Sequence, residues 1–265
     1  MTSAGLLPGF TFTQTALRTY QTCPYCFRLR YLEAVPWPTL ALDPAAEAAM
    51  ERGRRFHELA CQHFLDLEVA AQAEAAGGEL AAWWQALATA PPDLSLFPRR
   101  YPEAGLSIPL GDFRLAARYD LLAVGDAKAL IVDWKTGRHL ASAGELADDI
   151  QTRVYLYVLS VGGATYHAGR PFPPEALAIL YWHPRGPGQV RLPYNAARQA
   201  EDRAFLEALI REIASACPES MRPAASMEPC ASCAYAPLCG RPAASAPEWA
   251  EEETLFSEME TWPAE

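Results

Sequence analysis

The chain has 265 residues, 51% of them hydrophobic and 20% charged, so it can form one large globular domain or a core with an accessory subdomain. No apolar run reaches the length of a membrane span, and no basic-then-apolar signal pattern is present at the N-terminus. We therefore expect a cytoplasmic protein with no membrane partner. The net charge of −10 argues only weakly against a nucleic-acid partner, because seven glutamates lie in an expected acidic tail at residues 243–265.

The first 90 residues predict an N-terminal segment, 1–44, followed by a helical region, 45–90. Thr11–Tyr20 is typical of a short helix with a threonine cap, and Cys23-Pro24-Tyr25-Cys26 follows it. Helix formers dominate residues 45–76, where His57 shares an apolar helix side with Cys61 and Phe64. A single histidine in such a place is more often a core residue than a ligand.

Residues 91–216 predict a compact α/β core. A proline-punctuated connection at Pro91–Pro102 precedes the first strands. The expected elements are strands at Leu106–Leu110, Phe113–Val124, Ala129–Trp134, Ala176–Trp182 and Gln189–Pro193, and helices at Glu145–Val161 and Ala196–Ala216, the second capped by Asn195. On the first of these helices Gln151 and Tyr155 are four residues apart and therefore share a side.

The most informative stretch is a predicted hairpin between the strands at 113–124 and 129–134. A turn that pairs Gly125 with Lys128 places Asp120 opposite Asp133, with Cβ atoms about 5 Å apart. Lys135 points to the same face as Asp133. Like charges in this arrangement repel, and a hard cation such as Mg²⁺ or Mn²⁺ would relieve the repulsion. A slipped register, or a carboxylate at a solvated edge, would leave no such site.

Seven cysteines form a second pattern, and their odd number does not indicate a disulfide framework. Cys230, Cys233 and Cys239 have the spacing C-x2-C-x5-C, in residues 217–242, which can supply three corners of a tetrahedral thiolate site. Two arrangements remain open. A zinc ribbon would pair Cys23 and Cys26 with Cys230 and Cys233, whereas an iron–sulfur cluster would use Cys230, Cys233, Cys239 and one N-terminal cysteine. Cys61 and Cys217 are expected to be ordinary buried cysteines.

In this order the motifs resemble the PD-(D/E)XK nucleases of the RecB, AddB and Cas4 type, which carry a 4Fe–4S cluster. The resemblance spans about Thr13 to Cys239. It rests on the helix-then-Cys-Pro element, Gly53-x3-His57, Asp120, Asp133-Trp134-Lys135-Thr136-Gly137, Gln151-x3-Tyr155 and the closing cysteines. The chain departs from the pattern at Ala117, where family members often have glycine. The implied fold is a restriction-endonuclease-like core, a mixed sheet flanked by helices, with a helical insertion and an iron–sulfur subdomain joining the two ends of the chain.

The resemblance also implies residue roles. His57, Asp120, Asp133 and the backbone carbonyl of Trp134 would hold Mg²⁺ or Mn²⁺, and Lys135 would orient the attacking water. Gln151 and Tyr155 would approach the DNA backbone and the site, and Glu103 occupies roughly the place of a further acidic residue. The cluster ligands would be Cys23, Cys230, Cys233 and Cys239, with Cys26 as the competing first ligand.

The expected activity is a metal-dependent deoxyribonuclease, an exonuclease on single-stranded DNA or DNA ends. Two alternatives are a catalytically inactive DNA-binding subunit of a repair, recombination or CRISPR adaptation complex, and a zinc-stabilised interaction module. The sequence has no Gly-x4-Gly-Lys-Ser/Thr motif, so the chain is not itself an ATP-driven motor.

Overall fold

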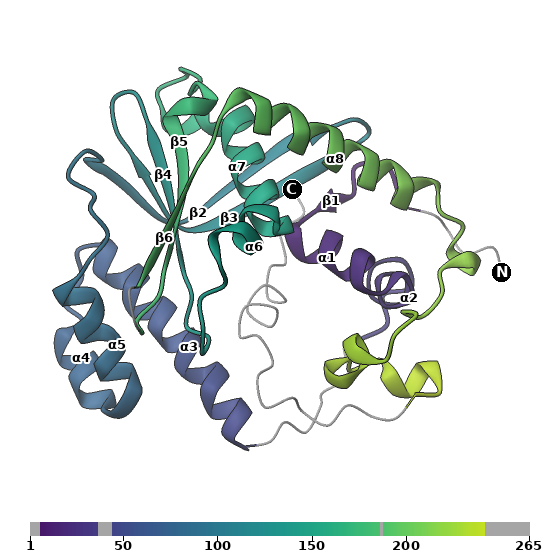
Figure 1. The fold of residues 1–265 in the computed structure, drawn as a ribbon, viewed down its shortest axis with the longest axis horizontal. Coiled ribbons are helices and arrows are strands. Elements are labelled where there is room, and N and C mark those ends of the chain that lie inside the picture. Colours follow the sequence, from purple (N-terminus) through teal and green to yellow (C-terminus); the bar gives the residue numbers. More distant parts are fainter. Residues whose placement is uncertain (1–5, 37–43, 186–187, 242–265) are drawn as a thin grey trace.

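The computed structural model describes residues 6–36, 44–185 and 188–241, and within them six strands form one mixed sheet (Figure 1). The strands are β1 (Thr11–Phe12), β2 (Arg99–Leu110), β3 (Phe113–Val124), β4 (Ala129–Trp134), β5 (Leu177–Trp182) and β6 (Gln189–Pro193). Their order is β1-β3-β4-β5-β6, with β2 also paired to β3. The pairs β1–β3 and β4–β5 are parallel, and the other three are antiparallel. This confirms the mixed α/β fold class.

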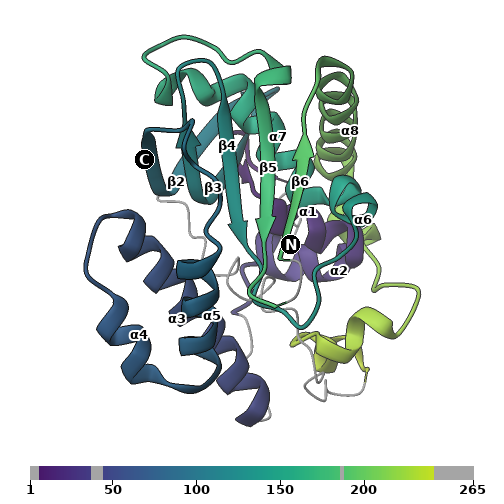
Figure 2. The ribbon, with the colours of Figure 1, turned by 60° about the vertical axis from the view of Figure 1, so that its left-hand side comes forward.

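Helices cover both faces of the sheet (Figure 2). They are α1 (Gln14–Thr22), α2 (Pro24–Phe27), α3 (Pro44–Phe64), α4 (Ala70–Ala76), α5 (Gly78–Thr89), α6 (Ala143–Asp148), α7 (Ile150–Gly162) and α8 (Ala196–Ser215). The apolar sides of α1, α7 and α8 pack on one face. Those of α3, α4 and α5 pack on the other face. The expected helical region therefore forms a separate layer, and His57 belongs to that layer.

The two faces have different cores. On the α7 face, Val154 and Val158 are buried with strand residues such as Ile131. On the α3 face, Phe56 stacks on Trp182 and Phe64 stacks on Trp134, with ring centroids 5.6 and 5.7 Å apart. All residues of β4 and β5 are buried, as is typical of central strands covered on both sides. The end of β4, which carries Asp133, is therefore fixed by packing from two directions.

The predicted hairpin register is confirmed. Leu121 pairs with Val132 and Val124 with Ala129, and the Gly125 N–H bonds to the Lys128 carbonyl at 2.9 Å. Of the two threonines that could cap the first helix, Thr11 and Thr13, it is Thr13 that does so, and the expected cap at Asn195 is present, since each side chain accepts a hydrogen bond from the first turn of its helix.

Three expectations about elements are corrected. Strand β2 begins at Arg99, within the expected connection, because long pairing with β3 overrides the local effect of Pro102. The helix expected at Glu145–Val161 is two helices, because Asp149 is extended, with a ψ of 141°, and caps α7. The stretch of helix formers at residues 45–76 is not one continuous helix, because helix α3 ends at Phe64 and Asp66 has a φ of +59°.

The acidic tail at 243–265 lies outside the described residues. None of the helices within the described ranges combines the length and apolarity needed to cross a membrane.

Candidate active site

Asp133, Lys135 and Gln151 form a closed hydrogen-bonded group at the end of β4. The Lys135 ammonium lies 2.8 Å from Asp133 Oδ1 and donates to Gln151 Oε1 at 2.8 Å. The Gln151 amide nitrogen donates to Asp133 Oδ2 at 2.9 Å. The side chains of Asp133 and Lys135 are only 5% and 12% exposed. Each of the three groups is thus bonded to the other two, and the lysine is held in a largely dry site.

Asp120 and His57 form the neighbouring half of the site, which α3 and β3 contribute. His57 Nδ1 is 3.3 Å from Asp120 Oδ1, and the Trp134 backbone N–H donates to Asp120 Oδ2 at 2.8 Å. The pairing of β3 with β4 ends at Leu121 and Val132, one step before the two aspartates. The Asp120 side chain therefore bonds to the backbone of β4 at the point where the ladder stops.

Glu103 of β2 adds a third carboxylate. It lies between Pro102, which pairs with Leu121, and Ala104, which pairs with Tyr119, and so stands opposite Asp120. Its φ is +51°, a left-handed conformation that is unfavourable for a glutamate. Its carboxylate lies 3.3 Å from Arg118 Nε. Sequence reasoning gave this residue little weight, because backbone conformation is not visible in a strand-like sequence.

The electrostatics reflect crowding of like charges. Burial raises the pKa of Asp133, and the Asp120 carboxylate adds to this effect, so that the pKa reaches about 6 although Lys135 opposes the shift. Burial likewise raises the pKa of Glu103, with a further contribution from Asp120. For Asp120, burial is outweighed by His57 and the Trp134 N–H, so its pKa is lowered. The pKa of His57 is raised, because the carboxylates outweigh its burial.

Whether these residues suit a metal ion follows from their chemistry. Among the described side chains, no three histidine, cysteine, aspartate or glutamate groups converge as a ready-made ligand set. Instead, the carboxylates here are bonded to Lys135, Gln151 and backbone. Three carboxylates and one imidazole nevertheless supply hard oxygen donors, and their mutual repulsion would fall on binding a divalent cation. The donor set therefore fits Mg²⁺ or Mn²⁺.

Tyr155 occupies a different place from the other expected site residues. It is 5% exposed and belongs to the core on the α7 face, where its ring meets Tyr119 edge-to-face at 5.3 Å. Tyr119 Oη also donates to the Tyr155 carbonyl at 3.2 Å. Tyr181, which sequence reasoning missed, lies nearer the lysine: the Lys135 ammonium is 4.9 Å from its ring centre. The sequence carries only a weak signal for Tyr181, because this residue resembles any other residue of a buried strand.

The turn after Lys135 is held by the segment that follows β5. His183 Nε2 and Arg185 Nη1 lie 2.8 and 3.2 Å from the Gly137 carbonyl. The Lys135 N–H bonds to the Trp182 carbonyl at 2.8 Å. These contacts fix the backbone on either side of Thr136, and so fix the direction in which Lys135 leaves the strand.

The cysteines form a second centre, where the two ends of the described chain lie side by side (Figures 1 and 2). Cys23, Cys26 and Cys233 belong to one buried cluster, in which Cys26 Sγ is 3.3 Å from Cys233 Sγ. The Tyr235 hydroxyl donates to the Val35 carbonyl at 2.7 Å and closes this contact between distant segments. The expected joining of the N-terminal and C-terminal segments is therefore observed.

No disulfide joins any of the seven cysteines, all of which lie in the described part of the chain. Hydrogen bonding from Cys26 lowers the pKa values of Cys23 and Cys233. Cys230 Sγ accepts a hydrogen bond from Arg241 Nη1 at 2.7 Å. Burial raises the pKa of the Cys239 thiol, and the thiols of Cys23, Cys233 and Cys230 add to this effect.

The remaining two cysteines differ from expectation. Cys217 is exposed, and Cys61 is half-buried, so neither is an ordinary core residue. Cys217 follows α8 in a surface segment, where its thiol donates to Glu219 at 2.8 Å. Cys61 lies one helical turn after His57, and burial together with Glu103 and Asp120 raises its pKa.

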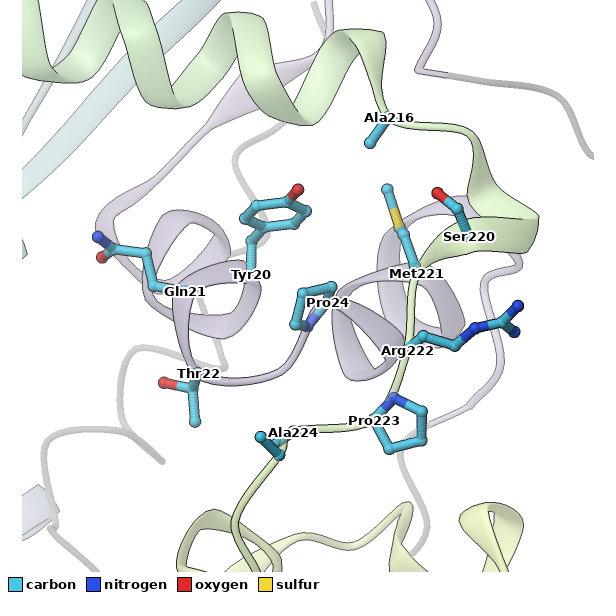
Figure 3. Close-up of a pocket in the computed structure, with 11 residues that line it drawn as sticks. Tyr20, Gln21, Thr22, Pro24, Ala216, Ser220, Met221, Arg222, Pro223 and Ala224 are labelled. Carbon is cyan, nitrogen blue, oxygen red and sulfur yellow. The ribbon is translucent and has the colours of Figure 1, made fainter.

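A cavity of about 380 Å³ lies between α1, α2 and the segment that follows α8 (Figure 3). Tyr20 and Met221 face one another across it in this view. None of its eleven lining residues carries a carboxylate or a thiol. The cavity is therefore separate from the carboxylate centre, and it borders the cysteine centre through Ala224, which packs with Cys23 and Cys26.

Comparison with known structures supports the fold. A structure named "Putative exonuclease", from Eubacterium rectale, aligns with a TM-score of 0.53 and 6% sequence identity, over 82% of this chain and 85% of that chain. The crystal structure of SSO0001 aligns with a TM-score of 0.43 and 14% identity, over 88% of this chain and 87% of that chain. No curated protein matches the sequence.

The structure thus combines a mixed α/β sheet with Asp120 and Asp133 on neighbouring strands and a lysine two residues after the second aspartate. The model of the PD-(D/E)XK nuclease superfamily matches residues 11–240, and the chain belongs to that family. Nucleases of this superfamily act on nucleic acids and typically use divalent metal ions such as Mg²⁺.

Proposed function

We propose that this protein is a Mg²⁺- or Mn²⁺-dependent deoxyribonuclease that degrades single-stranded DNA or DNA ends. The observation that carries the proposal is the closed group of Asp133, Lys135 and Gln151 beside the Asp120–His57 pair. A stable fold gains little from burying this many charges together, whereas phosphodiester hydrolysis needs a cation site next to a positioned lysine. A structural neighbour named as an exonuclease is in accord with the proposal.

His57, Asp120, Asp133 and the Trp134 carbonyl would hold the metal, and Glu103 is a further candidate ligand. A bound Mg²⁺ or Mn²⁺ supplies a water of lowered pKa and neutralises charge that develops on the phosphate. Asp133 must lose its proton to serve as a ligand, and the nearby Lys135 ammonium favours that loss. The His57 ring keeps the Asp120 carboxylate turned toward α3.

Lys135 would position the attacking water and stabilise negative charge on the scissile phosphate. Its ammonium is held by Asp133 and Gln151, so little reorganisation is needed before reaction. Gln151 contributes by holding both partners, and Tyr155 supports the same helix from the core. With Asp133 serving as a metal ligand, Gln151 would remain as a partner that holds Lys135.

The cysteine centre would hold a 4Fe–4S cluster, with Cys23, Cys230, Cys233 and Cys239 as ligands. Its donors would be four thiols drawn from both ends of the described chain, and four thiolates are the ligand set of such a cluster. The cluster would close a loop of about 200 residues and stabilise the fold. By its cysteines and motif order the protein would belong with the RecB, AddB and Cas4 type and act in DNA repair, recombination or CRISPR adaptation.

The test is degradation of internally labelled nucleic acids by the purified protein with Mg²⁺ or Mn²⁺. Linear single strands, linear duplexes, circular single strands and RNA separate exonuclease from endonuclease action and DNA from RNA specificity. We expect degradation of linear single-stranded DNA, little action on circles, and complete inhibition by EDTA. Action on circles would replace the exonuclease assignment by an endonuclease.

The chain offers a matched control for the catalytic lysine. Lys128 and Lys135 flank the same strand, but Lys128 lies in the hairpin turn over the Phe97 ring, away from the carboxylates. Lys135→Ala should abolish degradation, and Lys128→Ala should leave it unchanged. Equal activity of both variants would contradict the proposed site. If the wild-type protein binds DNA but does not degrade it, the result would instead indicate a non-catalytic DNA-binding subunit.

A further inference from the structure

Helix α1 connects the cysteine centre to the active-site helix α7. The helix ends at Cys23, its C-cap residue, and its buried side packs in the same core as α7. Arg18 lies five residues before that cysteine. Its Nη2 is 2.8 Å from Asp149 Oδ1, and the two side chains are 29% and 30% exposed. This ion pair therefore joins the N-terminal segment to the joint between α6 and α7.

Asp149 is more than a surface partner for Arg18. Its Oδ1 also accepts the Gln151 backbone N–H at 2.7 Å, so the carboxylate caps α7. Its own backbone is extended, with a ψ of 141°, where α6 ends and α7 begins. One carboxylate oxygen thus receives both the arginine of α1 and the first turn of α7. The orientation of that first turn depends on this shared acceptor.

The first turn of α7 carries the side chain that organises the site. Gln151 bonds to both Lys135 and Asp133, as described above. Thr152, the next residue, bonds through its hydroxyl to Tyr181 Oη at 2.6 Å, beneath the Lys135 ammonium. A rotation of this turn would move the partners of the lysine and of the aspartate at the same time.

Polar contacts supplement the core packing at the end of α1. Leu17 and Tyr20 are buried in the core that α1 shares with α7, whereas Tyr20, Gln21 and Thr22 also border the cavity shown in Figure 3. Two polar contacts add to this packing: the Arg18–Asp149 pair and a hydrogen bond of 3.1 Å from the Tyr20 hydroxyl to Glu212.

We propose that Arg18 is a positioning residue for the catalytic centre, acting through Asp149 on the placement of Gln151. This inference rests on the proposed nuclease function. Arg18 would not touch the reacting atoms. It would hold α7 in the orientation in which Gln151 reaches Lys135 and Asp133.

The test compares steady-state DNA degradation by wild type, Arg18→Gln, Arg18→Lys and Asp149→Asn. For Arg18→Gln we expect kcat to fall by about tenfold to a hundredfold, the effect of a small misplacement, with KM nearly unchanged. Arg18→Lys keeps the charge and should recover part of the rate. The double variant Arg18→Gln/Asp149→Asn should be no slower than the slower single variant, because both act through one contact. Arg203→Gln is the matched control, since Arg203 forms an exposed ion pair with Glu207 on α8.

A second readout does not depend on activity. Amide hydrogen exchange at residues 150–154 should quicken in Arg18→Gln relative to wild type, while the unfolding midpoint hardly changes, because a partly exposed ion pair contributes little to global stability. If wild type fails to cleave DNA, the proposed function fails, but the exchange result still tests the link. Unchanged exchange and unchanged kcat in Arg18→Gln would overturn the proposal. A rise in KM alone, with a reduced salt dependence of binding, would also overturn it, because it would mean that Arg18 contacts DNA phosphate.

Discussion

Glu103 stands opposite Asp120 across β2 and β3, and its backbone has a φ of +51° in the middle of a strand. Left-handed backbone at a non-glycine residue costs roughly 1–2 kcal/mol, and the like charge of Asp120 adds to the cost. Strain of this kind persists where function requires the side chain in that place. The three carboxylates of Glu103, Asp120 and Asp133 come from three adjacent strands and describe one acidic centre.

The strain at Glu103 predicts a separation of stability from activity. The free energy of unfolding of Glu103→Gly should be about 1 kcal/mol higher than that of Glu103→Gln. Both substitutions remove the charge, but only glycine relieves the strain of the left-handed backbone. Both variants should lose activity on the order of 100-fold, as expected for loss of a preorganised group. Urea unfolding and single-turnover cleavage measure the two effects.

Asp66→Gly is the control for this comparison, since Asp66 has a φ of +59° and is exposed at the end of α3. It should gain similar stability and keep full activity. Full activity in Glu103→Gln would remove Glu103 from the site.

Asp133 predicts a pH dependence of stability in protein without metal. A carboxyl group with a raised folded-state pKa binds its proton more tightly in the folded state, so its contribution to stability is lost as pH rises from about 4 to about 6. The free energy of unfolding of wild type, minus that of Asp133→Asn, should fall by up to about 3 kcal/mol across this range. Denaturant unfolding in EDTA at several pH values measures it.

Adding Mg²⁺ at pH 7 should restore part of the lost stability in wild type and none in Asp133→Asn, because the cation binds the ionised carboxylate. If the difference in unfolding free energy between wild type and Asp133→Asn stays constant or rises with pH, the folded-state pKa of Asp133 is not raised by burial and by the nearby carboxylate.

The cysteine centre makes a prediction that distinguishes its first ligand. Cys23→Ser should lose the visible colour and the roughly four irons per chain expected of a cluster, and should be less stable. Cys26→Ser should keep both, although Cys26 Sγ is 3.3 Å from Cys233. Cys217→Ser, at an exposed thiol away from the centre, is the control. Loss of iron in Cys26→Ser alone would reverse the assignment, and zinc in place of iron would contradict the cluster.

The sequence predicted those features that depend on strong local signals. The hairpin register follows from strand alternation and the turn at Gly125, and the helix caps follow from Thr13 and Asn195. The spacing of Asp133 and Lys135 was sufficient to place both on one face, where the structure finds them 2.8 Å apart. Gln151, expected from a motif alone, bonds to both.

Other features depend on tertiary structure and could not be predicted. The left-handed conformation of Glu103 arises where two paired strands deform together. The break at Asp149 falls within a stretch that reads as one helix, and the Asp149 carboxylate both caps α7 and binds Arg18, which is distant in sequence. Tyr155 has helical spacing from Gln151 yet lies in the core, since sequence spacing does not reveal how far a helix is buried.

The most direct test of the account is the single-turnover cleavage rate of linear single-stranded DNA in saturating Mn²⁺ by wild type, Asp133→Asn and Asp126→Asn. Asp126 lies in the turn of the same hairpin and is exposed, so its substitution controls for purification and folding. We predict cleavage at equal rates by wild type and Asp126→Asn, and a loss of at least about 1,000-fold in Asp133→Asn. Cleavage by Asp133→Asn at the wild-type rate would contradict the assignment of this centre as the nuclease site.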